Sequence, residues 1–363
     1  MLYHLLYPLR EFWFGFNVFK YITFRAAMGS VTAFLLSVML GPWVIRKLYA
    51  LKIGEQVRKG DDVSKLAVHL KSKEGTPTMG GILILLAIVF STVLWADMTN
   101  KYVLLVLMST IWLGVIGAID DSTKMLKKRS LGLKPLAKLQ WQFLLGLLIG
   151  SILCLDPRFQ TSLEVPFFKG LIIHLGLFYI LFAAIVVVGS SNAVNLTDGL
   201  DGLAIGTMIM IAFTYTGMSY IAGNIKFSGY LNTFYVPGAG ELAVFCAVLV
   251  GACLGFLWFN SYPASVFMGD TGSLALGGAI GTVAIFIKKE LLLFLVGGVY
   301  VAEALSVIIQ IISFRTTGKR VFLMSPLHHH FQLKGWPENK ITVRFWIAGV
   351  ILALISLATF KTR

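Results

Sequence analysis

The sequence has few charged residues and very few cysteines for its length. Only 13% of its 363 residues are charged, whereas 57% are apolar, and its mean hydropathy is +0.81. This composition excludes an ordinary water-soluble domain, which needs far more polar surface. The three cysteines (Cys154, Cys246 and Cys253) lie within or at the ends of apolar runs and lack metal-ligand spacing. They therefore indicate neither a disulfide framework nor a thiolate metal site.

A separate soluble domain is also lacking. The longest hydrophilic segment, 46–78, is too short to form its own core, and no repeat or low-complexity tract interrupts the chain. We therefore predict a single domain over 1–363. Residues 1–20 contain charges among aromatics and no small-residue cleavage site, which predicts an interfacial segment rather than a cleaved signal peptide.

What the sequence has in abundance is apolar runs of membrane-crossing length. A spanning helix needs about 20 mostly apolar residues, and every backbone polar group in lipid must be satisfied within the chain. The sequence therefore predicts an all-α polytopic membrane protein. The ten predicted transmembrane helices are 22–45, 79–96, 102–119, 135–154, 171–189, 202–222, 241–259, 271–288, 291–314 and 343–360.

The net charge of +14 fits the topology of such a protein without nucleic acid as a partner. Loops that face the cytoplasm carry an excess of lysine and arginine. The five loops on one side of the predicted membrane hold 18 basic residues, and the segments on the other side hold 10. We therefore expect the first set to be cytoplasmic and both termini to be periplasmic.

The stretch 189–202 separates two of the predicted spans and contains two asparagines, Asp198 and Asp201, with no lysine or arginine. Charge is costly near lipid, so acids there favour a functional hypothesis. The alternative is structural, in that Thr197 or Asp198 caps the next helix. The residues of this stretch alone do not decide between the two.

A second acidic group, Asp120 and Asp121, directly follows the predicted third span and precedes a run of lysines that includes Lys124 and Lys134. The structural alternative is a solvated turn. If the helix ends here, however, its macrodipole disfavours negative charge, so a cation is expected to offset it. Adjacent carboxylates are ligands that Mg²⁺ prefers. The lysines serve the topology or hold a lipid phosphate.

A third acidic position, Asp270, ends the short link 260–270. It either caps the helix that follows or belongs to a phosphate site at the start of that helix. Phe267 offers a flat apolar face for a base ring. All five acids named so far fall at span ends on the predicted cytoplasmic side. This convergence predicts a cytoplasmic-face active site.

Three further features complete the candidate set. Lys73 opens the Gly- and Pro-rich start of the second span and is a candidate substrate contact beside the acids. His328, His329 and His330 are consecutive and so cannot all face one ion, and we interpret them as donors to phosphate and sugar oxygens. Glu303 lies within the ninth span without an evident role, and pairing with a neighbouring helix is the expectation.

Six motifs in order carry a resemblance that covers essentially the whole chain. They are Gly-Thr-Pro-Thr-Met-Gly-Gly (75–81), Asp-Asp (120–121), Asn-Ala-Val-Asn-Leu-Thr-Asp-Gly-Leu-Asp-Gly (192–202), Gly-Phe-Leu-Trp-Phe-Asn (255–260), Phe-Met-Gly-Asp (267–270) and Pro-Leu-His-His-His (326–330). With them the chain resembles the bacterial phospho-N-acetylmuramoyl-pentapeptide transferases (translocase I), within the polyprenyl-phosphate N-acetylhexosamine-1-phosphate transferase superfamily. Leu327 and the pair Phe331-Gln332 depart from the expected pattern and leave the fine shape of that loop open.

The resemblance implies a Mg²⁺-dependent enzyme of the bacterial inner membrane. It implies transfer of phospho-N-acetylmuramoyl-pentapeptide from the UDP-sugar to undecaprenyl phosphate, giving lipid I and UMP. By the same resemblance, Asp270 binds the metal and Asp120 prepares the lipid phosphate. Asp121 is a further catalytic candidate, and the division of roles between Asp120 and Asp121 is left open. The positions that it assigns to the nucleoside and sugar-phosphate pocket are Lys73, Thr78, Asn195, Asp198, Asp201, Asn260, Phe267, His328, His329 and His330. Membrane lipids are expected partners, and a homodimer is left open.

Two other functions are compatible with parts of the sequence. A sister enzyme would take UDP-N-acetylglucosamine, but the histidine tract and the adjoining Lys334 favour the muramoyl substrate. An ion-coupled transporter would place its acids near the bilayer midplane on broken helices, whereas this sequence keeps all but Glu303 at one boundary. Within the transferase, direct attack by the lipid phosphate and a covalent aspartyl step are both open.

Overall fold

The apolar runs fold into helices in the computed structural model, which describes residues 1–51, 75–126, 132–168 and 171–359. The short elements are α1 (Leu2–Leu6), η1 (Tyr7–Glu11), η2 (Phe14–Lys20), β1 (Ser162–Glu164), β2 (Ile172–His174), α9 (Ile225–Tyr230), η4 (Ala239–Glu241), α12 (Leu293–Val296) and α14 (Leu327–Leu333). The long helices are α2 (Ile22–Ala50), α4 (Gly81–Trp95), α5 (Lys101–Leu126), α6 (Pro135–Cys154), α7 (Phe178–Thr197), α8 (Leu203–Ala222), α10 (Leu242–Asn260), α11 (Gly269–Phe286), α13 (Gly298–Thr317) and α15 (Glu338–Ala358).

Each of the ten predicted spans overlaps one of the ten long helices. Eight of these are long and apolar enough to cross a membrane: α2, α5, α6, α7, α8, α10 (with the η4 turn), α13 and α15. The other two are α4, with 15 residues, and α11, with 18. The polytopic membrane class is therefore confirmed, while the count of ten spans and the side on which the termini lie stay predictions.

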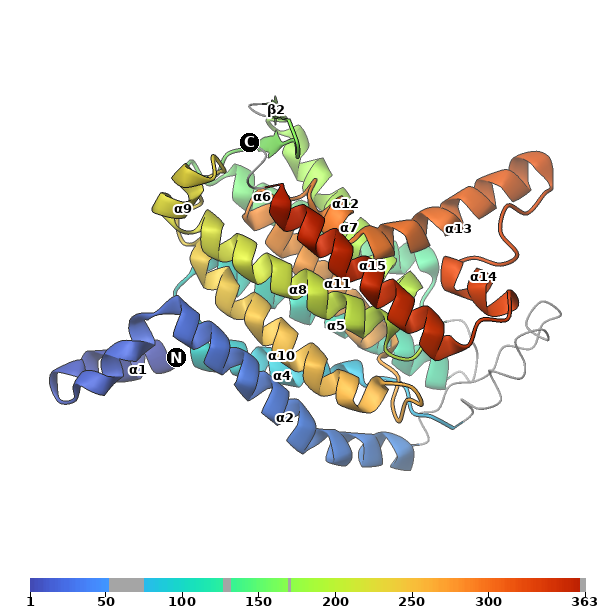
Figure 1. The fold of residues 1–363 in the computed structure, drawn as a ribbon, viewed down its shortest axis with the longest axis horizontal. Coiled ribbons are helices and arrows are strands. Elements are labelled where there is room, and N and C mark those ends of the chain that lie inside the picture. The colour runs from blue at the N-terminus through green and yellow to red at the C-terminus, as the bar shows by residue number, and fades with distance from the viewer. Residues whose placement is uncertain (52–74, 127–131, 169–170, 360–363) are drawn as a thin grey trace.

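Two helices, α10 and α11, form the centre of the bundle (Figure 1). Every α11 residue from Thr271 to Phe286 is buried, and α11 packs mainly on α5 and α7 while α10 packs on α2 and α8. Small residues permit this close packing, because helices in lipid associate through backbone approach rather than through hydrophobic exclusion. A Cβ on Gly117 of α5 would lie 2.2 Å from the Asp270 carbonyl oxygen, so α5 and α11 are in backbone contact there.

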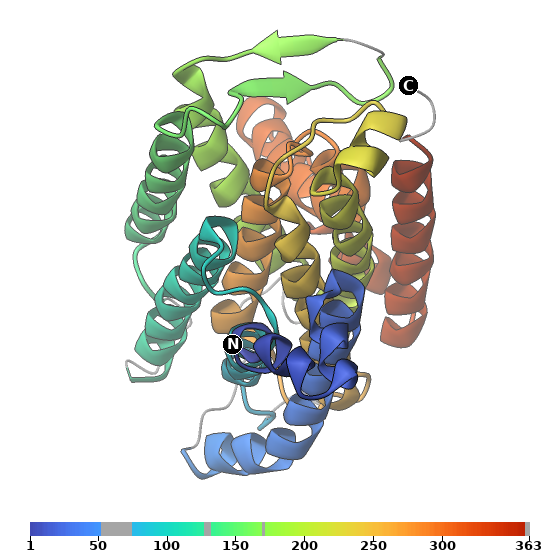
Figure 2. The same cartoon turned by 90° about the vertical axis from the view of Figure 1, so that its left-hand side faces the viewer.

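The outer helices are less buried. In α13 and α15 only 22% of the most apolar window is covered by the rest of the protein, and α13 leans away from the bundle (Figure 1). The apolar side chains on these two helices therefore suit a lipid environment. The antiparallel hairpin of β1 and β2, with Leu163 opposite Ile173, lies across one end of the bundle (Figure 2).

The predicted fifth span, 171–189, was placed wrongly. Its first residues form β2, and α7 begins only at Phe178 and continues to Thr197. The polar end of α7 remains helical because its side chains find partners: the Asn192 amide donates to Gln142 Oε1 of α6 (2.7 Å) and to the Val188 carbonyl (2.8 Å). Asn192 and Asn195 therefore lie on a helix rather than in a loop.

One predicted helix end was also wrong, and the difference changes an argument. The third span does not end at Ile119, because α5 runs on to Leu126, so Asp120 and Asp121 are not at a helix C-terminus and the macrodipole argument does not apply. The capping alternatives fail as well. Helix α8 follows Gly202 in the left-handed conformation, and neither α8 nor α11 has a side-chain hydrogen bond from its own N-cap residue.

Candidate active site

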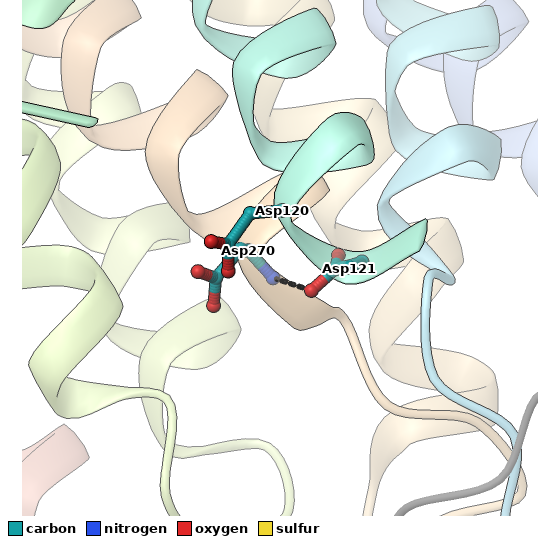
Figure 3. Close-up of side chains that lie close together, drawn as sticks. All are labelled: Asp120, Asp121 and Asp270. Carbon is teal, nitrogen blue, oxygen red and sulfur yellow. Dashed lines mark hydrogen bonds between the residues drawn. The ribbon is translucent and has the colours of Figure 1, made fainter. Parts of the chain in front are cut away.

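Three aspartates from two helices meet at one end of the bundle. Asp120 and Asp121 lie on α5, and Asp270 lies in the first turn of α11 (Figure 3). One carboxylate oxygen from each lies within 4.8 Å of the others. Asp120 and Asp121 are each only 3% exposed. The predicted convergence of these carboxylates, separated by about 150 residues in sequence, is therefore present in the fold.

Asp121 uses its carboxylate to cap the start of α11. It accepts hydrogen bonds from the backbone N–H of Asp270 (3.2 Å) and from the backbone N–H (2.9 Å) and hydroxyl (2.7 Å) of Thr271. The first N–H groups of a helix have no partner within the helix, and a negative charge is favourable beside them. Asp121 therefore fixes where α11 begins and, with it, where the Asp270 side chain lies.

Asp120 faces the other way and holds the segment that leads into α6. Its Oδ1 accepts the backbone N–H of Leu133 (2.7 Å), and its Oδ2 lies 2.7 Å from the Lys124 ammonium, one helical turn along α5. A Cβ on Gly132 would lie 2.5 Å from Asp120 Oδ1, so the close approach needs glycine. Asp120 is thereby oriented toward Asp270.

Asp270 is the most connected of the three. Its Oδ2 pairs with Lys138 of α6 (2.5 Å) and with Lys124 (3.2 Å), and its Oδ1 accepts the Asn195 amide (2.9 Å). The same amide also lies 2.8 Å from the Ser273 hydroxyl. Four helices (α5, α6, α7 and α11) thus bring polar groups to one carboxylate, which is a preorganised arrangement.

The chemistry of this donor set fits a hard divalent cation. Carboxylate oxygens within 4.8 Å of one another are what Mg²⁺ takes as ligands. Three carboxylates against the two ammonium groups of Lys124 and Lys138 leave one negative charge in excess. Of the three, Asp120 and Asp270 would hold the ion, because each presents its Oδ2 to mobile lysine ammonium groups, whereas both oxygens of Asp121 accept backbone N–H groups of α11.

The glycine-rich segment 75–81 lies against the segment before α11. Phe267 donates its backbone N–H to the Pro77 carbonyl (2.8 Å), and its own carbonyl accepts from Gly80 (2.8 Å). A Cβ on Gly269 would lie 2.7 Å from Asp121 Oδ2 and 2.9 Å from the Thr78 hydroxyl oxygen. Thr78 and the backbone of Phe267 therefore lie next to the start of α11 that Asp121 caps. Lys73 lies outside the described residues.

Asp201 and Asn260 connect two loops beside the cluster. Asp201 is 4% exposed; its Oδ2 accepts the Ala264 N–H (3.0 Å), and its backbone N–H donates to Glu338 (2.8 Å). Asn260 accepts from Gly202 (3.1 Å) and donates to the Val266 carbonyl (2.9 Å). These contacts tie the turn before α8 to the segment before α11 and to the start of α15. Asp198 is half-buried at the C-terminal end of α7.

The three histidines of α14 point to three different partners. His328 pairs with Glu303 at 3.3 Å, His329 with Gln332 at 2.8 Å, and His330 Nδ1 accepts the Leu323 N–H at 3.1 Å. Burial, together with nearby Lys334, lowers the pKa of His330 below its ordinary value. A neutral ring is what its acceptor role requires. Glu303 does pair with a neighbouring helix, as expected.

Sequence reasoning missed Lys138 and Ser273 as members of the site. Lys138 was only one of a run of cations, and the candidate named instead, Lys134, is exposed at the start of α6. Lys124, the other cation named, does reach all three aspartates. Ser273 lies three residues after Asp270, so the helical repeat places both on one face of α11. That spacing was the available signal for Ser273.

Two family models match regions of this chain that contain the cluster or the glycine-rich segment beside it. The Glycosyl transferase family 4 model matches residues 103–288, which include all three aspartates and both lysines of the cluster. The phospho-N-acetylmuramoyl-pentapeptide-transferase signature 1 matches residues 73–85, which hold the glycine-rich segment. The two matches thus meet where segment 75–81 packs on the start of α11.

Curated relatives are similar over the whole length. Phospho-N-acetylmuramoyl-pentapeptide-transferases of Citrifermentans bemidjiense, Geobacter sp. (strain M21) and Desulforapulum autotrophicum are 56%, 55% and 52% identical to this chain. In each comparison the alignment covers 100% of this chain and 100% of the relative.

Proposed function

We propose, from the premise that this chain belongs to the phospho-N-acetylmuramoyl-pentapeptide-transferase family, that the aspartate cluster is the active site of that transfer. The enzyme moves phospho-N-acetylmuramoyl-pentapeptide from its UDP-sugar to undecaprenyl phosphate and releases lipid I and UMP, a step of peptidoglycan biosynthesis. The observation that carries the assignment is the meeting of Asp120, Asp121 and Asp270 at one end of the helical bundle.

The proposed cofactor is Mg²⁺, held by Asp120 and Asp270. When bound, it would neutralise negative charge on the diphosphate of the UDP-sugar. Lys124 and Lys138 supply further positive charge at the same carboxylates. Phosphoryl transfer asks a protein mainly for positioning and for charge neutralisation, and this set of residues provides both.

The site suits one dissolved and one membrane-anchored substrate. It lies at the ends of apolar helices, where a prenyl phosphate in lipid and a water-soluble nucleotide can meet. We place the enzyme in the bacterial inner membrane with this end facing the cytoplasm. The remaining pocket positions (Lys73, Thr78, Asn195, Asp198, Asp201, Asn260, Phe267 and the three histidines) are proposed to hold the nucleoside and sugar.

Direct attack is the proposed chemistry. An oxygen of the lipid phosphate bonds to the phosphorus that carries the sugar, the bond from that phosphorus to the bridging oxygen breaks, and UMP leaves with that oxygen. A phosphate monoester has its second pKa near about 6 and is already largely dianionic. Asp120 therefore positions the lipid phosphate or removes a residual proton, and Asp121 keeps Asp270 in place.

A covalent route is tested by leaving out the lipid. The enzyme is incubated with Mg²⁺ and UDP-N-acetylmuramoyl-pentapeptide alone, and UMP and any phosphosugar-enzyme adduct are measured. Direct attack predicts neither product until undecaprenyl phosphate is added. A stoichiometric burst of UMP with an adduct on an aspartate would overturn direct attack while leaving the transferase assignment standing.

Substrate and cofactor are tested on the same preparation. Radiolabelled UDP-N-acetylmuramoyl-pentapeptide should yield a lipid product, whereas UDP-N-acetylglucosamine should not. Removal of divalent ions with a chelator should abolish turnover, and added Mg²⁺ should restore it. Turnover of the N-acetylglucosamine donor would assign the sister activity, and turnover after complete chelation would remove Mg²⁺ from the mechanism.

A further inference from the structure

Glu303 and His328 are a fully buried acid and imidazole that lie outside the aspartate cluster. Glu303 is 0% exposed on α13, although that helix is mostly uncovered, and His328 is 1% exposed at the start of α14. Burial of an acid in an apolar bundle is costly unless it is paired. Among the described residues, the partner that this acid finds is His328.

The contact between them has two parts. Glu303 Oε1 accepts the backbone N–H of His328 (3.2 Å) and lies 3.3 Å from its Nδ1. The first contact satisfies a backbone donor in the first turn of α14. In the second contact, Nδ1 and Oε1 are close enough to form an ion pair when the ring is protonated, but their geometry is not that of a hydrogen bond. The carboxylate therefore turns the Nδ1 side of the ring toward α13.

The opposite side of the ring faces the turn that follows Asp198. A Cβ on Gly199 would lie 2.3 Å from His328 Nε2, so the imidazole is in direct contact with that backbone. No described residue makes a hydrogen bond to Nε2. A buried nitrogen held in this way is set up to bind a polar group beside the Asp198 turn, since leaving it unpaired costs free energy.

The backbone around the pair is fixed independently of it. Tyr300, one turn before Glu303 on α13, donates its hydroxyl to the Ala204 carbonyl of α8 (2.7 Å). This bond ties α13 to the helix that follows the Asp198 turn. Replacing Tyr300 by phenylalanine therefore tests a purely structural tie on the same face of α13.

From this geometry we infer that Glu303 is a positioning residue for binding of the nucleotide-sugar. It orients His328 so that Nε2 meets a polar oxygen or nitrogen of that substrate beside Gly199. The inference rests on the proposed function, because it takes the Asp198 turn and the histidine tract as the wall of the UDP-sugar pocket. Glu303 itself touches neither substrate nor the reacting phosphorus.

The test separates KM from kcat and looks for coupling. Purified Glu303→Gln, His328→Asn and the double variant are assayed for UMP release with saturating undecaprenyl phosphate and varied UDP-N-acetylmuramoyl-pentapeptide. Each single change should raise KM roughly tenfold with little change in kcat, because ground-state binding is lost. The double variant should be no worse than His328→Asn alone, because Glu303 acts through that ring.

Two further variants serve as controls. Tyr300→Phe should lower the thermal unfolding temperature without raising KM. Gly199→Ala should displace the His328 ring without touching Glu303 and should raise KM by a similar factor, which covers the case in which Glu303→Gln fails to fold. A wild-type KM in Glu303→Gln, or additive effects in the double variant, would overturn the inference. Failure of wild-type turnover would instead overturn the proposed function.

Discussion

Both ends of α11 carry buried charges, yet the two sets are built differently. At its start, Asp120, Asp121 and Asp270 face Lys124 and Lys138. Beyond its other end, about 27 Å away for an 18-residue helix, two lysines face two glutamates: Lys288 with Glu290 (3.3 Å), and Lys289 with Glu164 of the hairpin.

At the C-terminal end of α11, two lysines pair with two glutamates, so the buried charges there neutralise one another. Lys288 lies over the Tyr179 ring (4.0 Å), and the Tyr179 hydroxyl donates to Glu290, so Lys288 and Glu290 each have a charged and an aromatic neighbour. At the N-terminal end of α11, three aspartates against two lysines leave one formal negative charge in excess. One carboxylate oxygen of each aspartate lies within 4.8 Å of the others. Buried charge that is locally neutral connects parts of a fold, whereas a cluster with an excess of negative charge favours binding of a cation or a reacting group.

Asp270→Asn makes the formal charge of the aspartate cluster neutral, because two carboxylates then face two lysines. We expect turnover to fall by roughly a thousandfold, about 4 kcal/mol, because a proposed metal ligand and the partner of both lysines are lost. The free energy of unfolding should change less than for loss of a partner from a neutral pair, because the substitution also removes the excess negative charge and Lys124 keeps Asp120 as a partner. UMP release and thermal unfolding in detergent measure the two quantities, and full activity in this variant would remove Asp270 from the metal site.

Lys289→Met leaves one negative charge in excess beyond the C-terminal end of α11, where Lys289 pairs with Glu164. Removing one partner of a buried pair leaves a carboxylate without its ammonium, so stability should fall by about 3 kcal/mol, while turnover per folded molecule is retained. The double variant Lys289→Met with Glu164→Leu should recover part of the loss. Thermal unfolding provides the comparison. A loss of turnover without a loss of stability would show that this end takes part in the reaction.

Lys138→Met makes the aspartate cluster more negative. Turnover should fall about tenfold, which is less than for Asp270→Asn, because Lys124 still lies 3.2 Å from Asp270 Oδ2. The matched control is Lys226→Met, which removes the same charge from an exposed position on α9. Equal activities of the two variants would mean that only net charge matters and that the contact with Asp270 does not.

Much of the site could be predicted because its residue types are unusual in their setting. Carboxylates at the ends of apolar runs, such as Asp120 and Asp270, stand out in a chain with only 17 acids. Lys138 did not stand out, because lysines after a span also serve topology. The end of α5 was missed because a polar stretch can stay helical when it packs on another helix, as Asp121 does on α11.

The sequence by itself determined the membrane class and the candidate acids, because length, hydropathy and residue type are local properties of the chain. Only the tertiary structure decided which carboxylate does what. Asp121 caps α11, Asp120 and Asp270 face each other, and Glu303 meets His328. These relations depend on how helices distant in sequence pack, and that packing is set by close backbone approaches such as Gly117 against Asp270.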